Sequence, residues 1–141
     1  MLVALPNDKY FVKFRRPVRV DETLTVVLRA RLRTRGVSIP EGWQLFVTDT
    51  KRGRTSYKSK TVTVPTWAME TDPDGKPNEE YQIYYACHEI AHVYTPNRKG
   101  DVHGSDFMRN FIRVCPEEFL HYELGYKPRL AAAAGIRKNE R

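Results

Sequence analysis

Residues 78–94 read Asn-Glu-Glu-Tyr-Gln-Ile-Tyr-Tyr-Ala-Cys-His-Glu-Ile-Ala-His-Val-Tyr, the clearest helix signal in the chain. Asn78 is a good N-cap because its side chain can accept a hydrogen bond from the first turn, and Pro96 ends the helix. Apolar residues recur with a helical period at Ile83, Cys87, Ile90 and Tyr94. We therefore expect one helix over residues 78–94 that packs this apolar stripe against a core.

The same stretch contains the pattern His88-Glu89-Ile90-Ala91-His92. Residues four apart lie one turn apart on the same helix face, so both imidazoles can bind one tetrahedral ion. A glutamate directly after the first histidine reaches a water on that ion without binding the ion itself. The H-E-x-x-H pattern also occurs by chance on amphipathic helices. Its position inside a predicted helix nevertheless favours a metal site with Glu89 as general base.

A third ligand is needed, and His103 is the best candidate among the four histidines of the chain. It follows residues 96–100, whose proline and glycine allow the chain to turn back, and Gly104 permits a tight entry into the next helix. Three histidines leave one coordination position open, which is typical of catalytic zinc. We therefore expect a Zn²⁺ ion bound by His88, His92 and His103.

A purely structural zinc site is the alternative. Such sites normally close with a fourth protein ligand, frequently a cysteine, and near His103 only Asp101 and Asp106 could take that place. The same two aspartates, together with His121, are candidates to hydrogen-bond a metal ligand or to stabilise an oxyanion. Otherwise we expect His121, late in a predicted helix, at the surface.

The composition of the chain places only broad limits on its fold and function. A chain of 141 residues is expected to form one domain, and two cysteines are too few for a disulfide framework. The net charge of +7 suits DNA or another polyanion as a partner, although a merely basic surface explains it equally well. No apolar run is long enough to span a membrane and the first residues do not resemble a signal peptide, so we expect an intracellular, cytoplasmic protein without a membrane partner.

The segment before the metal motif predicts a helix and a small sheet. Residues 21–36 carry both a helical and a strand period, and the possible caps Asp21 and Gly36 favour the helix. Residues 43–48 and 58–64 read as two strands separated by a turn-rich segment. We expect these strands to form an antiparallel hairpin.

Two shorter helices are expected after the metal ligands, over residues 106–114 with Ser105 as cap and over residues 116–122. The expected fold class is therefore α+β: an N-terminal helix and a small antiparallel sheet packed on the helix of the metal site, with helices at the C-terminal end. Changes in composition divide the chain into a basic N-terminal extension, a domain and a basic C-terminal tail, which are residues 1–20, 21–127 and 128–141.

The metal motif resembles that of the SprT-like zinc metallopeptidases, the group that contains the Spartan DNA–protein crosslink proteases and is related to the WLM-type peptidases. The resembling residues are 88–92 (His-Glu-Ile-Ala-His) and, after ten intervening residues, 103–107 (His-Gly-Ser-Asp-Phe). The family pattern is H-E-x-x-H followed by H-G-x-x-F. The resemblance implies a zincin-like core, three histidine ligands, Glu89 as general base and Phe107 packed behind the site. The short chain is similar to the small stand-alone versions found in bacteria and their phages.

The activity implied is hydrolysis of peptide bonds in a protein or peptide substrate, with Glu89 taking a proton from a metal-activated water. A strand beside the metal-site helix resembles the family's edge strand and could pair with substrate backbone; its residues are Thr61, Val62, Thr63 and Val64. Action on DNA-associated proteins would combine the resemblance with the net charge. Two other functions stay open: a zinc hydrolase acting on another bond, and a non-proteolytic zinc-containing protein that binds nucleic acid through Arg15, Arg16 and residues 29–35.

Overall fold

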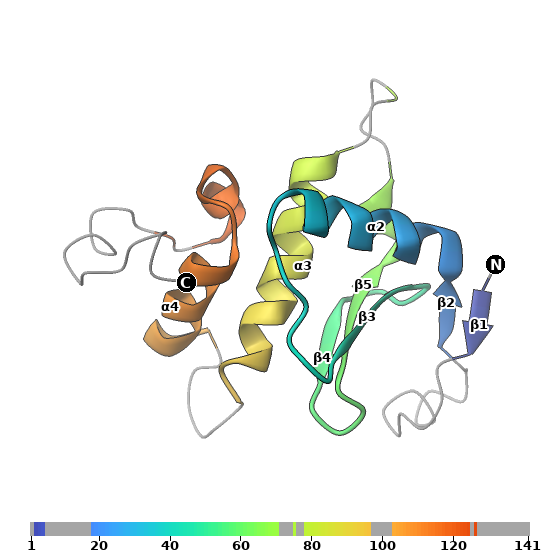
Figure 1. Cartoon of the computed structure of the whole chain (residues 1–141), viewed down its shortest axis with the longest axis horizontal. Coiled ribbons are helices and arrows are strands. Elements are labelled where there is room, and N and C mark those ends of the chain that lie inside the picture. The colour runs from blue at the N-terminus through green and yellow to red at the C-terminus, as the bar shows by residue number, and fades with distance from the viewer. Residues whose placement is uncertain are drawn as a thin grey trace.

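The computed structural model of the protein describes residues 2–4, 18–70, 75, 78–96, 103–124 and 126. This part of the chain forms a five-stranded sheet with helices packed against it (Figure 1), which confirms the mixed α+β class. In chain order the elements are β1 (Leu2–Ala4), β2 (Arg19–Asp21), α2 (Glu22–Thr34), β3 (Gln44–Thr48), β4 (Arg54–Ser56), β5 (Thr61–Pro65), η1 (Thr66–Met69), α3 (Glu79–Val93), α4 (Ser105–Val114) and η2 (Glu117–Tyr122), where η marks a 3₁₀ helix.

The strand order in the sheet is β1-β2-β3-β5-β4. β3 and β5 are parallel, with Leu45 opposite Val62, whereas β4 is antiparallel to β5. The predicted antiparallel hairpin of residues 43–48 and 58–64 is therefore wrong, because these two strands are parallel neighbours. The hairpin partner of β5 is β4, whose sequence Arg-Thr-Ser lacks the apolar alternation by which a strand is identified.

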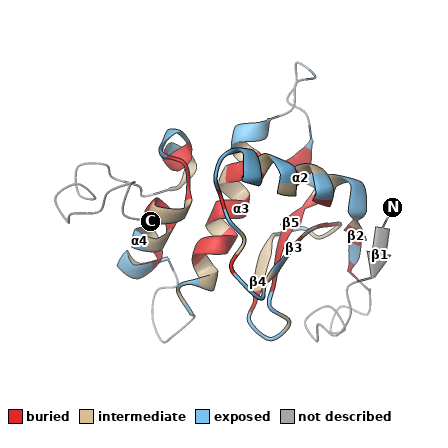
Figure 2. Ribbon diagram, in the orientation of Figure 1, coloured by how far each residue is buried: buried red, intermediate tan, exposed pale blue. Residues whose placement is uncertain are grey.

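β5 is an inner strand of the sheet. All five of its residues are buried, and it is hydrogen-bonded to β3 on one side and to β4 on the other (Figure 2). β4 pairs with Thr61, Val62 and Thr63, so these three residues have no free backbone edge for a further strand. The prediction of a substrate-binding edge strand is therefore wrong for Thr61, Val62 and Thr63, and Val64 continues the same buried inner strand beyond the last residue paired with β4. β4 is the outermost strand on this side of the sheet.

α2 confirms the helix expected over residues 21–36. Asp21 is its N-cap, and Oδ1 of this residue accepts a hydrogen bond of 2.9 Å from the amide of Leu24. Gly36, just after the helix, has a φ of +74°, a backbone conformation that residues with a Cβ rarely adopt. The prediction of a helix from the caps, over the competing strand period, is confirmed.

Side chains of α2 also cover the edge of β3. β2 pairs with β3 through a single residue pair, so part of that edge lacks a strand partner. The amide of Val47 donates to Thr25 Oγ1 at 2.9 Å, and the guanidinium of Arg29 donates to the carbonyl of Leu45 at 2.7 Å. These contacts satisfy buried backbone groups that a strand would otherwise satisfy.

α3 lies between the sheet and the C-terminal helices (Figure 1) and confirms the helix predicted over residues 78–94. Asn78 Oδ1 caps it by accepting from the amide of Tyr81 at 3.2 Å. Most of the expected apolar stripe is buried in the core, namely Ile83, Cys87 and Ile90. Tyr94, the fourth member, is 52% exposed because the helix ends there and its ring extends beyond the core.

The C-terminal helices differ in detail from expectation. α4 begins at Ser105, and its N-cap is Gly104 without a side-chain hydrogen bond. The segment expected as a helix over residues 116–122 is the 3₁₀ helix η2, which buries Phe119 and Leu120 against α3. Within the described ranges no helix is long and apolar enough to cross a membrane.

The predicted domain boundary at residue 21 falls within the sheet. Residues 19–21 form β2 and pair with residues 2–4, so the segment before α2 contributes two strands. The basic tail expected over residues 128–141 lies outside the described residues.

Candidate metal centre

Three histidines come together at one end of α3. His88 and His92 lie one turn apart on this helix, and His103 directly precedes α4. Each presents one ring nitrogen, and the three nitrogens lie within 4.8 Å of one another. This cluster contains the three predicted ligands, and it can bind a metal ion.

His103 directly precedes α4, and α4 is attached to the end of α3 by hydrogen bonds. The side-chain amide of Asn110 donates to the carbonyl of Tyr94 at 3.2 Å and to Thr95 Oγ1 at 2.7 Å, which joins α4 to the C-terminal end of α3. His92 Nε2 and His103 Nε2 lie 3.1 Å apart. Ligand nitrogens about 2.0–2.1 Å from a tetrahedral ion lie roughly 3.3 Å apart, so this spacing suits a shared ion.

Phe107 lies behind the three imidazoles. Its side chain is fully buried, and its ring centroid lies 5.0 Å from that of His88, 4.5 Å from that of His92 and 5.0 Å from that of His103. This is the packing position that the family resemblance implies for the phenylalanine of H-G-x-x-F. A rigid ring at this place limits the rotamers that the three imidazoles can adopt.

Glu89 lies beside the cluster without belonging to it. Its Oε2 is 4.0 Å from His88 Nε2, and its side chain is 10% exposed. Thr55 of β4 holds it, with Oγ1 lying 2.7 Å from the Glu89 carbonyl oxygen and 3.1 Å from Oε1. Burial raises the pKa of Glu89 above the usual value of a carboxyl group, against the charge of His88 and the hydrogen bond from Thr55. A raised pKa suits a group that takes and returns a proton near neutral pH.

The electrostatics of the two helical ligands differ. Burial, together with the neighbouring His88 and His103, lowers the pKa of His92 to about 4. Burial also lowers the pKa of His88, but the hydrogen bond and charge of Glu123 outweigh it and the net pKa is raised. His92 is therefore neutral at physiological pH, the form in which an imidazole binds a metal.

Glu123, just after η2, contacts the ring of His88 at Nδ1. Its Oε1 lies 2.5 Å from His88 Nδ1, and its side chain is 9% exposed. The phenol of Tyr84 donates to the same oxygen at 3.2 Å. Glu123 was not among the predicted site residues. No local signal marks it, because it lies 35 positions from His88 and after an ordinary acidic segment.

The residues expected to support the ligands are placed elsewhere. Asp106 is exposed in the first turn of α4, and His121 is exposed on η2 with its ring against Tyr122. Neither belongs to the group of residues that can share an ion. Asp101 lies outside the described residues. Glu123 makes the contact with a ligand that Asp106 and His121 were expected to make.

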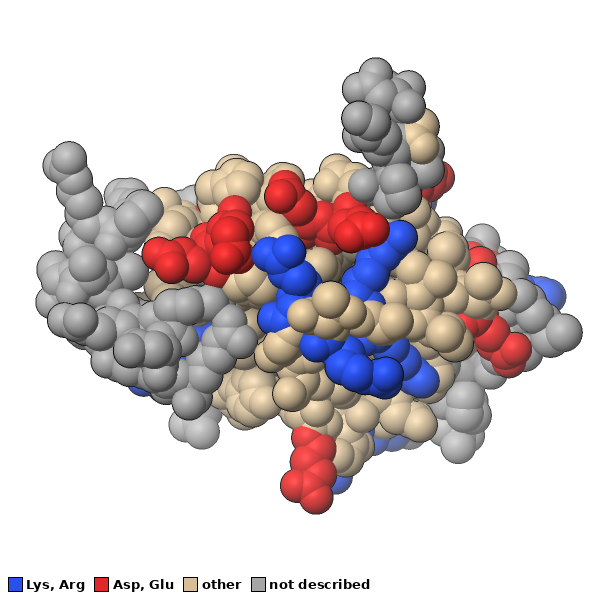
Figure 3. All heavy atoms as spheres, turned by 45° about the horizontal axis from the view of Figure 1, so that its top comes forward, with Lys and Arg blue, Asp and Glu red and all other residues tan. Residues whose placement is uncertain are grey.

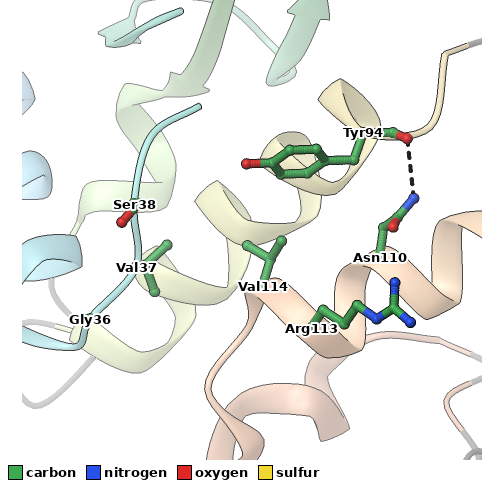
Figure 4. A pocket seen from close by; sticks show the side chains of 7 residues that line it. All are labelled: Gly36, Val37, Ser38, Tyr94, Asn110, Arg113 and Val114. Carbon is green, nitrogen blue, oxygen red and sulfur yellow. Dashed lines mark hydrogen bonds between the residues drawn. The ribbon is translucent and has the colours of Figure 1, made fainter. Parts of the chain in front are cut away.

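A separate cavity of about 410 Å³ opens at the other end of α4, between the loop after α2 and the end of α3 (Figure 4). Its lining comprises Gly36, Val37, Ser38, Tyr94, Asn110, Arg113 and Val114. None of the three histidines and no part of Glu89 lines it, so it is not the candidate metal centre.

The basic stretch of α2 is largely engaged within the protein. Arg29 donates to the sheet, Arg31 lies 3.6 Å from a carboxylate oxygen of Glu79, and Arg35 lies 3.4 Å from one of Glu118. On the face drawn in Figure 3, basic side chains accordingly lie next to a band of acidic ones. Arg15 and Arg16 lie outside the described residues.

Comparison of the chain with protein-family models, with curated proteins and with solved structures finds no match in any of the three. Fold and site together define a mixed α+β protein with a three-histidine cluster close enough to bind a metal ion.

Proposed function

We propose that the protein is a zinc-dependent peptidase of the SprT-like type with a zincin-like core. The observation that carries the proposal is the convergence of three histidine nitrogens within 4.8 Å, with the buried carboxylate of Glu89 4.0 Å from one of them. The two motifs, residues 88–92 and 103–107, are the sequence support for it.

The donor set suits zinc. Three imidazoles are a common ligand set of catalytic zinc sites, and the described residues place no fourth side chain in the cluster. Zinc bound there would supply Lewis acidity, which polarises a carbonyl group and makes a water molecule easier to deprotonate.

Glu89 has the proton-transfer role in this proposal. It takes the proton of the attacking water and returns it to the leaving amine, as a general base and then a general acid. Its burial and raised pKa favour both steps, because the group is neither a strong acid nor fully solvated. The hydroxyl of Thr55 keeps its carboxylate on the side of His88.

β4 replaces β5 as the strand that we propose for substrate binding. It is the outermost strand next to α3, and Thr55 at its centre contacts the backbone and the carboxylate of Glu89. An extended peptide added at such an edge is held through its backbone, which gives low sequence selectivity.

The test compares wild-type protein with Glu89→Gln. We expect both to contain stoichiometric zinc by metal analysis, because Glu89 is not a ligand. Digestion of casein or histone by the wild type should fall at least ~100-fold in the variant, since general base catalysis contributes typically 10²–10⁴-fold. Equal digestion by the two proteins would refute the assignment of Glu89, and a zinc-free, inactive wild type would refute the peptidase itself.

Binding of DNA stays a prediction that rests on the net charge of +7. The internal contacts of Arg29, Arg31 and Arg35 weaken the case for α2 as the binding surface. Gel shifts at several salt concentrations test it, because affinity for a polyanion falls steeply with salt. Shifts with an inactive, zinc-containing protein would favour the non-proteolytic alternative.

A further inference from the structure

We infer that Glu123 is a positioning residue of the metal centre: it holds His88 in the tautomer with a proton on Nδ1, and thereby makes the segment after α4 part of the metal site. The inference rests on the metal-binding part of the proposed function and does not depend on peptide hydrolysis.

The His88 ring is oriented with its two nitrogens towards different partners. Nδ1 lies 2.5 Å from Glu123 Oε1, while Nε2 lies 4.0 Å from Glu89 Oε2. A carboxylate accepts hydrogen bonds, so the ring nitrogen next to it carries the proton. The lone pair is then on Nε2, the ring nitrogen that remains to bind the ion that His88 would share with His92 and His103. A histidine bound to a metal commonly donates its other N–H to a carboxylate in this way.

The carboxylate of Glu123 is itself held in place by hydrogen bonds. Tyr84, one turn before His88 on α3, donates its hydroxyl to the same oxygen of Glu123 at 3.2 Å. The Glu123 side chain is 9% exposed, and a carboxylate removed from water to this extent needs such donors. Two side chains of one helix therefore hold Glu123 at a defined place on that helix.

The backbone of Glu123 is attached to the core through η2. Its amide donates to the carbonyl of Leu120 at 3.1 Å, which closes the end of η2. Phe119 and Leu120 are 1% and 2% exposed, so η2 is packed into the core that also holds α3. The carboxylate is thus presented by a packed segment rather than by a mobile loop.

Binding of the ion and docking of η2 are thermodynamically linked. If the docked η2 segment increases affinity for the ion, the ion must stabilise the docked segment by the same free energy. Hydrogen exchange of the amides of residues 117–124 should therefore slow when the protein is loaded with zinc. Removal of the Glu123 carboxylate should abolish most of that effect.

The experiment uses three variants. Glu123→Leu removes the acceptor, Glu123→Gln keeps an acceptor oxygen but removes the charge, and Glu117→Gln is the matched control on the exposed side of η2. Zinc affinity is measured by competition with a chromophoric chelator. We expect a loss of roughly 10- to 100-fold for Glu123→Leu, a smaller loss for Glu123→Gln, and no change for Glu117→Gln.

A second readout reports the tautomer directly. Nitrogen-15 NMR of the metal-free protein should show the proton of His88 on Nδ1 in the wild type and in Glu123→Gln, and a mixture of tautomers in Glu123→Leu. If Glu123→Leu does not fold, by circular dichroism, then Glu123→Gln decides by its zinc affinity. Zinc affinity of Glu123→Gln equal to that of the wild type, or a wild-type proton on Nε2, would overturn the inference. A protein that binds zinc in this manner but cleaves no peptide would refute only the peptidase.

Discussion

The backbone amide of Gly53 donates a hydrogen bond of 2.8 Å to the phenolic oxygen of Tyr85. A Cβ at position 53 would lie 2.4 Å from a ring carbon of Tyr85 and 2.6 Å from the carbonyl oxygen of Thr63. Only glycine permits this approach, and it places the start of β4 directly on α3, one helical turn before Glu89.

Gly53→Ala should destabilise the protein, because the added methyl group must displace either the Tyr85 ring or the backbone of β5. We expect a loss of about 1–3 kcal/mol, the usual cost of overpacking a filled site. Urea unfolding measures it. Tyr85→Phe is the matched variant: it removes only the hydroxyl that accepts from Gly53 and should cost about 1 kcal/mol. A Gly53→Ala protein as stable as the wild type would contradict the close packing of Gly53 against Tyr85 and Thr63.

His103→Ala should remove metal binding, while His121→Ala should leave it intact. His103 supplies one of the three clustered nitrogens, whereas His121 is exposed on η2 and outside the cluster. Loss of one of three protein ligands should lower zinc affinity by at least ~100-fold, because two imidazoles alone hold zinc weakly. Isothermal titration with zinc compares the two variants. Equal loss in both would show that His121 contributes to the site.

Arg29→Gln should destabilise the fold, whereas Arg33→Gln should not. The Arg29 guanidinium donates to the carbonyl of Leu45 and lies over the ring of Phe46, 5.4 Å from its centroid. Arg33 is exposed. We expect about 1–3 kcal/mol for the lost charged hydrogen bond and less than ~0.5 kcal/mol for Arg33. Thermal unfolding at low and high salt gives both values; a larger effect at Arg33 would contradict the structural role of Arg29.

Stability should fall above about pH 10 because tyrosines ionise more readily in the unfolded chain. Burial raises the pKa of Tyr81 and Tyr85 above the ordinary value of a tyrosine phenol. The unfolded state therefore loses its phenolic protons first, so their stabilising effect is complete below pH 10 and is lost as pH rises through the folded-state pKa. Tyrosinate absorbance and circular dichroism, followed together, should show part of the ionisation coinciding with unfolding. Ionisation of all eight tyrosines near pH 10 with the fold intact would contradict this.

Much of the site follows from local sequence. The helix that carries His88 and His92 has its cap, its apolar stripe and its stop within one continuous stretch, and the geometry of an α-helix alone brings residues four apart to one face. The same local logic identified α2 from the caps Asp21 and Gly36. Such features need no knowledge of distant contacts.

The strand pairing could not be read in this way. Residues 43–48 and 58–64 each look like strands, but whether they pair as parallel or antiparallel neighbours depends on β4, three polar residues between them. The edge strand was misplaced for the same reason. β5 has the stronger strand sequence, and burial of all its residues reflects a central position that only the complete sheet reveals.

By itself, the sequence determined which helix holds the metal motif and which residue types meet on its face, because hydrogen bonds between near neighbours in the chain set the helical period. Tertiary structure alone decided that β4 lies against Glu89 and that Glu123, 35 residues away, contacts His88. These contacts join segments whose separation along the chain carries no periodic signal. They form only when burial of the common core brings β4, α3 and η2 together.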